Sequence, residues 1–251
     1  MRRTLLVVLA HPDDELGCAG AIAAQVARGD RAVVVWLTRG EMTEAFGRLG
    51  TDEVARRRQE QGAEAARILG AEYRFLSFPD TRLRGSPEEA TLVARVVAEL
   101  KPDGVLTWGE GWVRGSRHPD HQAAGKIARD AITLARIAKV VEPTAPHRGF
   151  CPVFTMRDVH SPLPAVAVDV APHIGVIRAL ASFYHARIGF GEESWLEGRL
   201  RDQGRPFGLE RAEVFDAWES RPGVVTALLP ADPGSYGQHP VRADPAPLGA
   251  D

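Results

Sequence analysis

Residues 1–20 read MRRTLLVVLAHPDDELGCAG. The unbroken apolar run at 5–10 is typical of a parallel strand that is buried on both faces. It ends abruptly in HPDDE at 11–15, which places an imidazole and three carboxylates within five residues. Residues 15–28 follow with small and apolar side chains at helical spacing, and Gly29-Asp30 ends them. This stretch therefore predicts a buried strand, a polar turn and a helix, which is the first unit of an α/β fold.

The alternation of strand and helix continues along the chain. Further strands are predicted at 31–37, 73–78, 103–108, 152–157 and 165–170, and further helices at 53–69, 87–100, 120–134 and 172–185. Thr51-Asp52 offers an N-cap for the helix at 53–69, and Gly70 ends that helix. This order predicts an α/β fold with a Rossmann-like, mostly parallel sheet flanked by helices.

Length and composition are those of one globular domain. The chain has 251 residues, of which 44% are hydrophobic and 25% charged, and a net charge of −2. No repeat or linker divides it, so we expect a single domain over 1–229 and a loosely ordered tail over 230–251, which is rich in Pro, Gly, Ala and Asp. The near-neutral charge gives no reason to expect a nucleic acid or a membrane as partner. A homo-oligomer is left open.

The N-terminus differs from a secretory signal. Its apolar stretch is too short, and HPDDE interrupts it where a small-residue cleavage site would stand. No run of about 18 apolar residues predicts a transmembrane helix. We therefore expect a cytoplasmic protein, with Cys18 and Cys151 as reduced thiols.

Two polar clusters follow different strands of this predicted sheet. HPDDE follows the strand at 5–10, and RHPDH at 117–121 follows the strand at 103–108. In the common strand order 3-2-1-4-5, the first and fourth strands are neighbours. Ligands bind beyond their carboxyl ends, where the strand order reverses. We therefore expect the two clusters to meet in one crevice.

The residue types in the clusters favour a zinc site. Histidine nitrogen and carboxylate oxygen bind Zn²⁺ at about 2.0–2.2 Å, and catalytic sites keep three protein ligands and an open position. His11 and Asp14 can point at one ion from a helix start, and His121 can supply the third ligand. Asp13 and His118 then remain beside the metal as an acid and a base, where a carboxylate can take the proton of a zinc-bound water.

Each cluster also has a purely structural interpretation. Asp13 or Asp14 could be a helix N-cap. HPDH could be a helix start with Pro119 at the first helical position and Asp120 in the first turn. A dinucleotide site is disfavoured, because G-x-G-x-x-G does not follow the first strand and the acidic cluster would repel phosphate. The convergence of both clusters favours the metal site.

HPDDE after the first strand, with HPDH about a hundred residues later, resembles the LmbE-like (PIG-L) family of zinc-dependent N-acetylglucosaminyl deacetylases. Four further segments are similar to family motifs: TRGE at 38–41, the helix from Arg58 to Gly70, FPD at 78–80, and VDV at 168–170 followed by Arg178 and His185. The resemblance covers residues 4 to about 187. Gln61 departs from it, since the helix motif usually has glutamate there.

The resemblance implies an LmbE-like deacetylase fold and specific residue roles. His11, Asp14 and His121 would bind zinc, in whose place another divalent cation such as Fe²⁺ could serve. Asp13 would be the general base that activates water. His118 would stabilise the oxyanion or protonate the leaving amine.

Other residues are candidates for contacts with the substrate. By the resemblance, Arg58 and Asp80 would lie near the sugar or its aglycone, and Glu15 would support the site from behind or through the helix start. Trp112 and Arg114, on a glycine-containing loop, could contact a sugar face and an anionic aglycone, or simply be solvated. Asp169 and His185 could form a buried hydrogen bond or have a functional role.

These implications predict a hydrolase that removes the acetyl group from an N-acetylglucosaminyl small molecule, releasing acetate and a free amine. One such substrate is GlcNAc-malate, in the synthesis of a sugar-linked thiol such as bacillithiol. Two other functions stay open: a deacylase of a non-sugar amide, and a non-catalytic metal- or carbohydrate-binding module. Asp13 and His118 argue against the module, because a pure binder needs neither.

Overall fold

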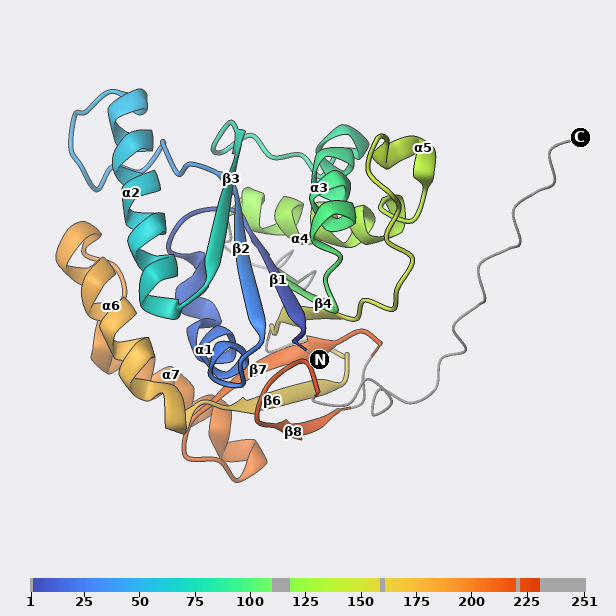
Figure 1. Cartoon of the computed structure of the whole chain (residues 1–251). Coiled ribbons are helices and arrows are strands. Elements are labelled where there is room, and N and C mark those ends of the chain that lie inside the picture. The colour runs from blue at the N-terminus through green and yellow to red at the C-terminus, as the bar shows by residue number, and fades with distance from the viewer. Residues whose placement is uncertain (1, 110–117, 159–160, 220–221, 231–251) are drawn as a thin grey trace, which may run out of the picture.

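The computed structural model describes residues 2–109, 118–158, 161–219 and 222–230 (Figure 1). The described residues form an eight-stranded sheet in the order β3-β2-β1-β4-β5-β7-β6-β8. The strands are β1 (Thr4–Leu9), β2 (Arg31–Thr38), β3 (Glu72–Phe78), β4 (Gly104–Thr107), β5 (Val153–Met156), β6 (Ala165–Asp169), β7 (Ala212–Ala217) and β8 (Gly223–Val225). Strands β1 to β5 run parallel to one another, whereas β7 is antiparallel to both β5 and β6.

Helices cover both faces of the sheet. On one side, α1 (Ala19–Ala27), α2 (Thr51–Leu69) and α6 (Ile174–Ile188) pack together, and on the other α3 (Pro87–Leu100), α4 (Pro119–Leu134) and the short α5 (Ala138–Val141) do so (Figure 1). Helix α7 (Glu193–Gly204) packs on β7 and α6. Short 3-10 helices lie at η1 (Asp14–Gly17), η3 (Ala171–His173) and η4 (Arg205–Phe207). No helix in the described ranges is long and apolar enough to cross a membrane.

Strand β1 lies between β2 and β4, and all its side chains from Leu5 to Leu9 are fully buried. Each such side chain contributes about 1.5–3 kcal/mol by leaving water. Burial on both faces explains why this run is apolar throughout rather than alternating. The strand therefore holds the turn that follows it in a fixed position at the carboxyl edge of the sheet.

A close approach brings the start of α4 to the same edge. A Cβ added at Gly125 would lie 2.3 Å from the carbonyl oxygen of Trp108, directly after β4. Only a residue without a side chain allows α4 to pack this closely on the end of β4. This contact sets the place of the HPDH segment at residues 118–121.

The predicted fold class is confirmed, and so is the strand order 3-2-1-4-5. The predicted helix at 87–100 has those bounds, and the other predicted elements agree to within a few residues. The limits of the predicted domain stay a prediction. Residues 231–251 of the expected tail lie outside the described residues.

Three details of the prediction are wrong. The helix expected at 15–28 is split into η1 and α1, because Asp14 turns back onto the end of β1 and tightens the first turn. Helix α2 begins after Gly50, with no side-chain cap from Thr51 or Asp52. The helix expected from residue 172 begins as the 3-10 turn η3, and α6 extends to Ile188.

Candidate active site

The carboxyl ends of β1, β2, β3 and β4 lead into one cavity of about 580 Å³. HPDDE and HPDH meet there, as expected from the strand order. The polar groups that line the cavity include His11, Asp13, Asp14, Asp80, His118 and His121. Gly40, after β2, and Thr81, after β3, complete the same wall.

The Asp14 carboxylate uses its two oxygens differently. Oδ2 accepts hydrogen bonds from the backbone N–H groups of Ala10 at 2.9 Å and His11 at 3.0 Å, and from Nε1 of Trp108 at 2.9 Å. Oδ1 lies 3.1 Å from Nε2 of His121 and 3.9 Å from Nδ1 of His11. Burial raises the pKa of Asp14, but the two histidines outweigh it and hold this pKa well below its usual range. Asp14 is therefore an ionised carboxylate with one oxygen directed at two imidazoles.

The second nitrogen of His11 faces two further carboxylates. Nε2 lies 3.0 Å from Oδ1 of Asp80 and 3.3 Å from Oδ2 of Asp120. Burial lowers the pKa of His11, but hydrogen bonds to Asp120, Asp14 and Asp80 outweigh it and raise the pKa to about 12. A carboxylate on the far nitrogen is the usual support of a metal-binding imidazole, because it fixes the ring and its tautomer.

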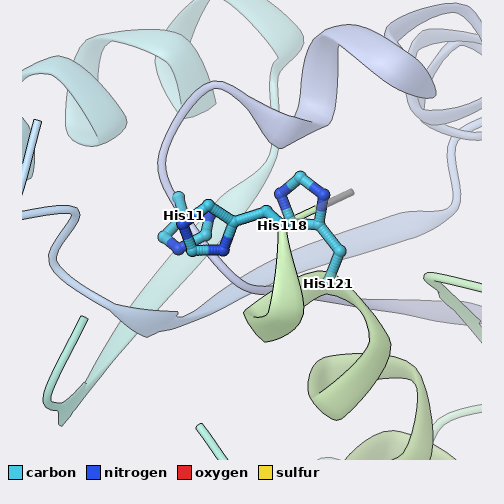
Figure 2. A group of neighbouring side chains, drawn as sticks. All are labelled: His11, His118 and His121. Atoms are coloured by element: carbon cyan, nitrogen blue, oxygen red, sulfur yellow. The ribbon is translucent and has the colours of Figure 1, made fainter. Parts of the chain in front are cut away.

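Three imidazole rings gather at this place (Figure 2). His11 follows β1, whereas His118 and His121 stand at the start of α4, and one nitrogen from each lies within 4.8 Å of the others. A second group with this spacing consists of His11, Asp80 and Asp120. Nδ1 of His118 accepts the backbone N–H of Asp120 at 3.3 Å, so HPDH is also a capped helix start. Burial lowers the pKa of His118, and the neighbouring His11 lowers it further.

These donor atoms fit a divalent cation. Ligands of a tetrahedral Zn²⁺ at about 2.1 Å lie about 3.4 Å from one another. The distances from Oδ1 of Asp14 to the nitrogens of His121 and His11 are 3.1 and 3.9 Å. The three donors are borderline nitrogen and hard oxygen atoms, the combination that zinc and other first-row divalent metals accept. The structure thus contains a His/Asp cluster that could hold a metal ion.

Asp13 stands beside this cluster without joining it. Its backbone is left-handed, with φ of 104°, and Nη2 of Arg58 donates to its Oδ2 at 2.6 Å. Burial raises the pKa of Asp13 to about 6, although Arg58 opposes this shift. No side-chain capping hydrogen bond forms at Asp13, so its interpretation as a helix cap is wrong. Such a strained position at a cavity wall is typical of a functional residue.

Arg58 is held by several acceptors at once. Its Nη1 donates to Oε1 of Gln61 at 2.7 Å, and its Nη2 also donates to the carbonyl oxygen of Pro12. The side chain is 1% exposed and lines the cavity. Gln61 therefore still serves as an acceptor where the family motif has glutamate. Arg58 orients Asp13 directly.

Glu15 is fully buried and does not line the cavity. Its Oε2 accepts from the backbone N–H of Asp13 at 3.0 Å and from Nε1 of Trp36 at 3.0 Å, and its Oε1 accepts from the hydroxyl of Tyr184 at 2.5 Å. The structure thus gives Glu15 contacts inside the protein, where it supports the strained turn at Asp13. Glu15 is therefore not placed to contact a substrate in the cavity.

The remaining predicted residues divide into three groups. Asp80 lines the cavity and contacts His11. Trp112 and Arg114 lie outside the described residues. Asp169 accepts from the backbone N–H of Ala171, whereas His185 is exposed on α6, so of the two alternatives for this pair the buried hydrogen bond is wrong.

Sequence reasoning missed three side chains of this cavity and its surroundings. Trp108 connects Asp14 and His121, Asp120 supports His11, and Arg199 of α7 lines the cavity. Asp120 had a signal, because it is the acidic residue of HPDH, although the helix-start interpretation accounted for it equally well. Arg199 had no such signal, because no motif or spacing in the sequence connects residue 199 with the HPDDE segment.

A family model described as PIG-L, GlcNAc-PI de-N-acetylase, matches residues 6–132, which is about half of the chain. The chain belongs to the PIG-L family. The matched PIG-L region contains most of the residues that line the cavity described above, including those contributed by HPDDE, Arg58, Asp80 and HPDH.

Individual PIG-L relatives agree with this assignment. A diacetylchitobiose deacetylase of Thermococcus kodakarensis is 31% identical over 53% of this chain and 50% of its own length. A probable N-acetyl-alpha-D-glucosaminyl L-malate deacetylase 2 of Bacillus anthracis is 34% identical over 57% of this chain and 64% of its own. The chain thus spans about half to two thirds of these two relatives. The solved structure of the conserved protein TT1542 from Thermus thermophilus is 33% identical, with a TM-score of 0.72, over 86% of this chain and 94% of that one.

Proposed function

We propose that this protein hydrolyses the acetamide of an N-acetylglucosaminyl small molecule to acetate and a free amine. The observation that carries the proposal is that the neighbouring carboxylates of Asp13 and Asp14 have different partners. Asp14 directs one oxygen at His11 and His121, while Asp13 is held apart from them by Arg58 in the same cavity. Relatives named as deacetylases of GlcNAc-containing small molecules support the same reaction.

His11, Asp14 and His121 would hold Zn²⁺, which supplies Lewis-acid polarisation of the acetamide carbonyl and lowers the pKa of a water molecule. Fe²⁺ has the same preference for nitrogen and oxygen donors and is the alternative metal. Asp80 and Asp120 would fix the orientation of His11 from behind.

Asp13 acts as the general base. One of its oxygens is engaged by Arg58, and the other takes a proton from the attacking water while the water oxygen adds to the carbonyl carbon. The C–N bond then breaks, and the proton held on Asp13 passes to the leaving nitrogen. One water is consumed, and acetate and an amine are released.

His118 acts on the carbonyl oxygen as that atom gains negative charge. Its Nδ1 accepts a backbone N–H, so the proton of the neutral ring is on Nε2, which can donate a hydrogen bond. The lowered pKa of His118 favours this neutral, donating form. A donor fixed by the start of α4 needs no reorganisation during the reaction.

The test is a panel of amides incubated with zinc-loaded protein, with acetate release as the readout. N-acetylglucosaminides with varied aglycones should release acetate, whereas simple N-acetyl amides without a sugar should not. Acetate from the simple amides alone would favour a deacylase of non-sugar substrates. Binding of sugars without any acetate would favour a carbohydrate-binding module. The cytoplasmic location and a homo-oligomeric state stay predictions from the sequence.

A further inference from the structure

Part of the cavity wall comes from the C-terminal third of the chain, outside the region matched by the family model. Phe190 precedes α7, and Trp195 and Arg199 lie on it, four residues apart and therefore on one helix face. Trp195 is 56% exposed and Phe190 46% exposed, although both are large aromatic side chains. An exposed apolar group at the mouth of a cavity is a candidate contact for a ligand.

Arg199 brings a positive charge into this wall. Its Nη2 donates to the carbonyl oxygen of Leu16 at 3.2 Å, and its guanidinium lies 5.5 Å from the centre of the Trp195 ring. Leu16 belongs to η1, which begins with Asp14. Arg199 is thus anchored to the same short turn that carries a proposed metal ligand, and it lines the same cavity.

No carboxylate of the described residues lies within ion-pair distance of Arg199. Three other arginines nearby do have such a partner. They pair with Glu197 of α7 and are Arg178, Arg201 and Arg211. The Nε of Arg199 is buried without a hydrogen-bond partner. An arginine fork with unused donors is suited to bidentate recognition of a carboxylate or phosphate.

Among the described residues, Glu213 of β7 is a carboxyl whose charge acts on Arg199 and raises its pKa against the effect of burial. Both Glu213 oxygens are already used, because they accept the backbone N–H groups of Gly20 at 2.9 Å and Ala21 at 2.8 Å. The other arginine that lines the cavity, Arg58, is neutralised by Asp13. Arg199 is therefore the arginine of the described cavity wall whose charge lacks a paired carboxylate.

We propose that Arg199, with Trp195 beside it, forms a subsite for an anionic group on the part of the substrate beyond the acetamido sugar. The inference rests on the proposed function, and it narrows the substrate class to acidic N-acetylglucosaminides. Trp195 packs against the apolar part of the aglycone, and Arg199 pairs with its carboxylate or phosphate. A substrate anion supplies the counter-charge that this wall lacks.

The test compares three N-acetylglucosaminides that differ only at the end of the aglycone: 3-hydroxypropanoate, its neutral amide, and 2-hydroxyethyl phosphate. Arg199→Gln is the variant, and Arg201→Gln is the matched control, since it removes the same charge from an exposed position on the same helix. We expect Arg199→Gln to lower kcat/KM for an anionic substrate by about 10-fold or more, mainly through KM, and to change the neutral substrate by less than about 2-fold. The carboxylate and phosphate arms identify which anion is preferred.

A binding measurement separates this proposal from the proposed reaction. The corresponding free-amine glucosaminides cannot be deacetylated, so their affinities for the wild-type and variant proteins are measured by calorimetry. Tighter binding of the acidic ligands to wild type, lost in Arg199→Gln and kept in Arg201→Gln, supports the subsite even if no acetate is released. Equal effects on acidic and neutral ligands, or no preference in wild type, would overturn it.

Discussion

The indole of Trp108 stacks on the imidazole of His121, with ring centroids 3.9 Å apart and planes inclined by 8°, and its Nε1 donates to Asp14 at 2.9 Å. One side chain after β4 therefore orients two of the three proposed metal ligands. It also connects the HPDDE and HPDH segments, which are about a hundred residues apart in the sequence.

Trp108→Phe keeps an aromatic ring against His121 but removes the donor to Asp14. We expect zinc affinity to fall about 10- to 100-fold, because Oδ2 of Asp14 keeps its two backbone donors but loses the side-chain donor that fixes it relative to His121. Competition with a chromogenic chelator measures the affinity. Trp218→Phe is the control, since its indole N–H bonds Thr155 elsewhere in the fold. Unchanged affinity in Trp108→Phe would mean that the indole only fills space.

Arg58→Gln should separate catalysis from metal binding. Arg58 fixes Asp13 rather than the metal cluster, so we expect kcat to fall about 100-fold through misplacement of the base, with bound zinc unchanged. Arg57→Gln is the control, because Arg57 is exposed and pairs with Glu53. Metal content and turnover are measured on the same preparations. A parallel loss of both quantities would contradict the assigned role of Arg58.

The buried Glu15 should contribute strongly to stability. Glu15→Ala leaves Trp36, Tyr184 and the backbone of Asp13 without their shared acceptor, which we expect to lower the free energy of unfolding by about 3 kcal/mol or more. Glu15→Gln should lose less, because its oxygen can still accept from Trp36 and Asp13. Urea unfolding measures both variants. Equal losses would show that charge, rather than hydrogen bonding, matters at this position.

Stability should also depend on pH through Glu213. Burial raises the pKa of Glu213 from 4.5 to about 7, while the N–H groups of Gly20 and Ala21 and the charge of Arg199 oppose the shift. Between these two values the folded carboxyl stays protonated and the unfolded one ionises, so stability falls as pH rises from about 4.5 to 7. The loss should be on the order of 3 kcal/mol. Urea unfolding at pH 5, 6 and 7 should show this extra slope in wild type and not in Glu213→Gln.

The first half of the fold could be predicted because its strands are buried on both faces. Such strands are continuous apolar runs, as in β1 and β2, and their parallel order fixes where the polar segments after them meet. The meeting of HPDDE and HPDH follows from that order. The interpretation of HPDH as a helix start was also correct, because His118 caps α4 and lines the cavity at once.

The C-terminal part could not be predicted, because tertiary contacts override its local pattern. β7 is fully buried, yet it carries Glu213 and Asp216, which interrupt the apolar signal of a strand. α7 is polar on most sides, so its place at the cavity was not visible. The sequence suggested Trp112 and Arg114 as sugar and anion contacts. Those two residues lie outside the described residues, so that suggestion stays a prediction, and among the described residues a tryptophan and an arginine line the cavity together at Trp195 and Arg199.

The central claim is that His11, Asp14 and His121 hold the metal while Asp13 moves the proton. It is tested most directly by measuring bound zinc and acetate release together in Asp13→Ala and His121→Ala, with N-acetylglucosaminides as substrates. We predict that Asp13→Ala keeps about one zinc per chain but loses turnover, and that His121→Ala loses the metal and the turnover together. Near-full turnover in Asp13→Ala, or full zinc retention in His121→Ala, would contradict the account.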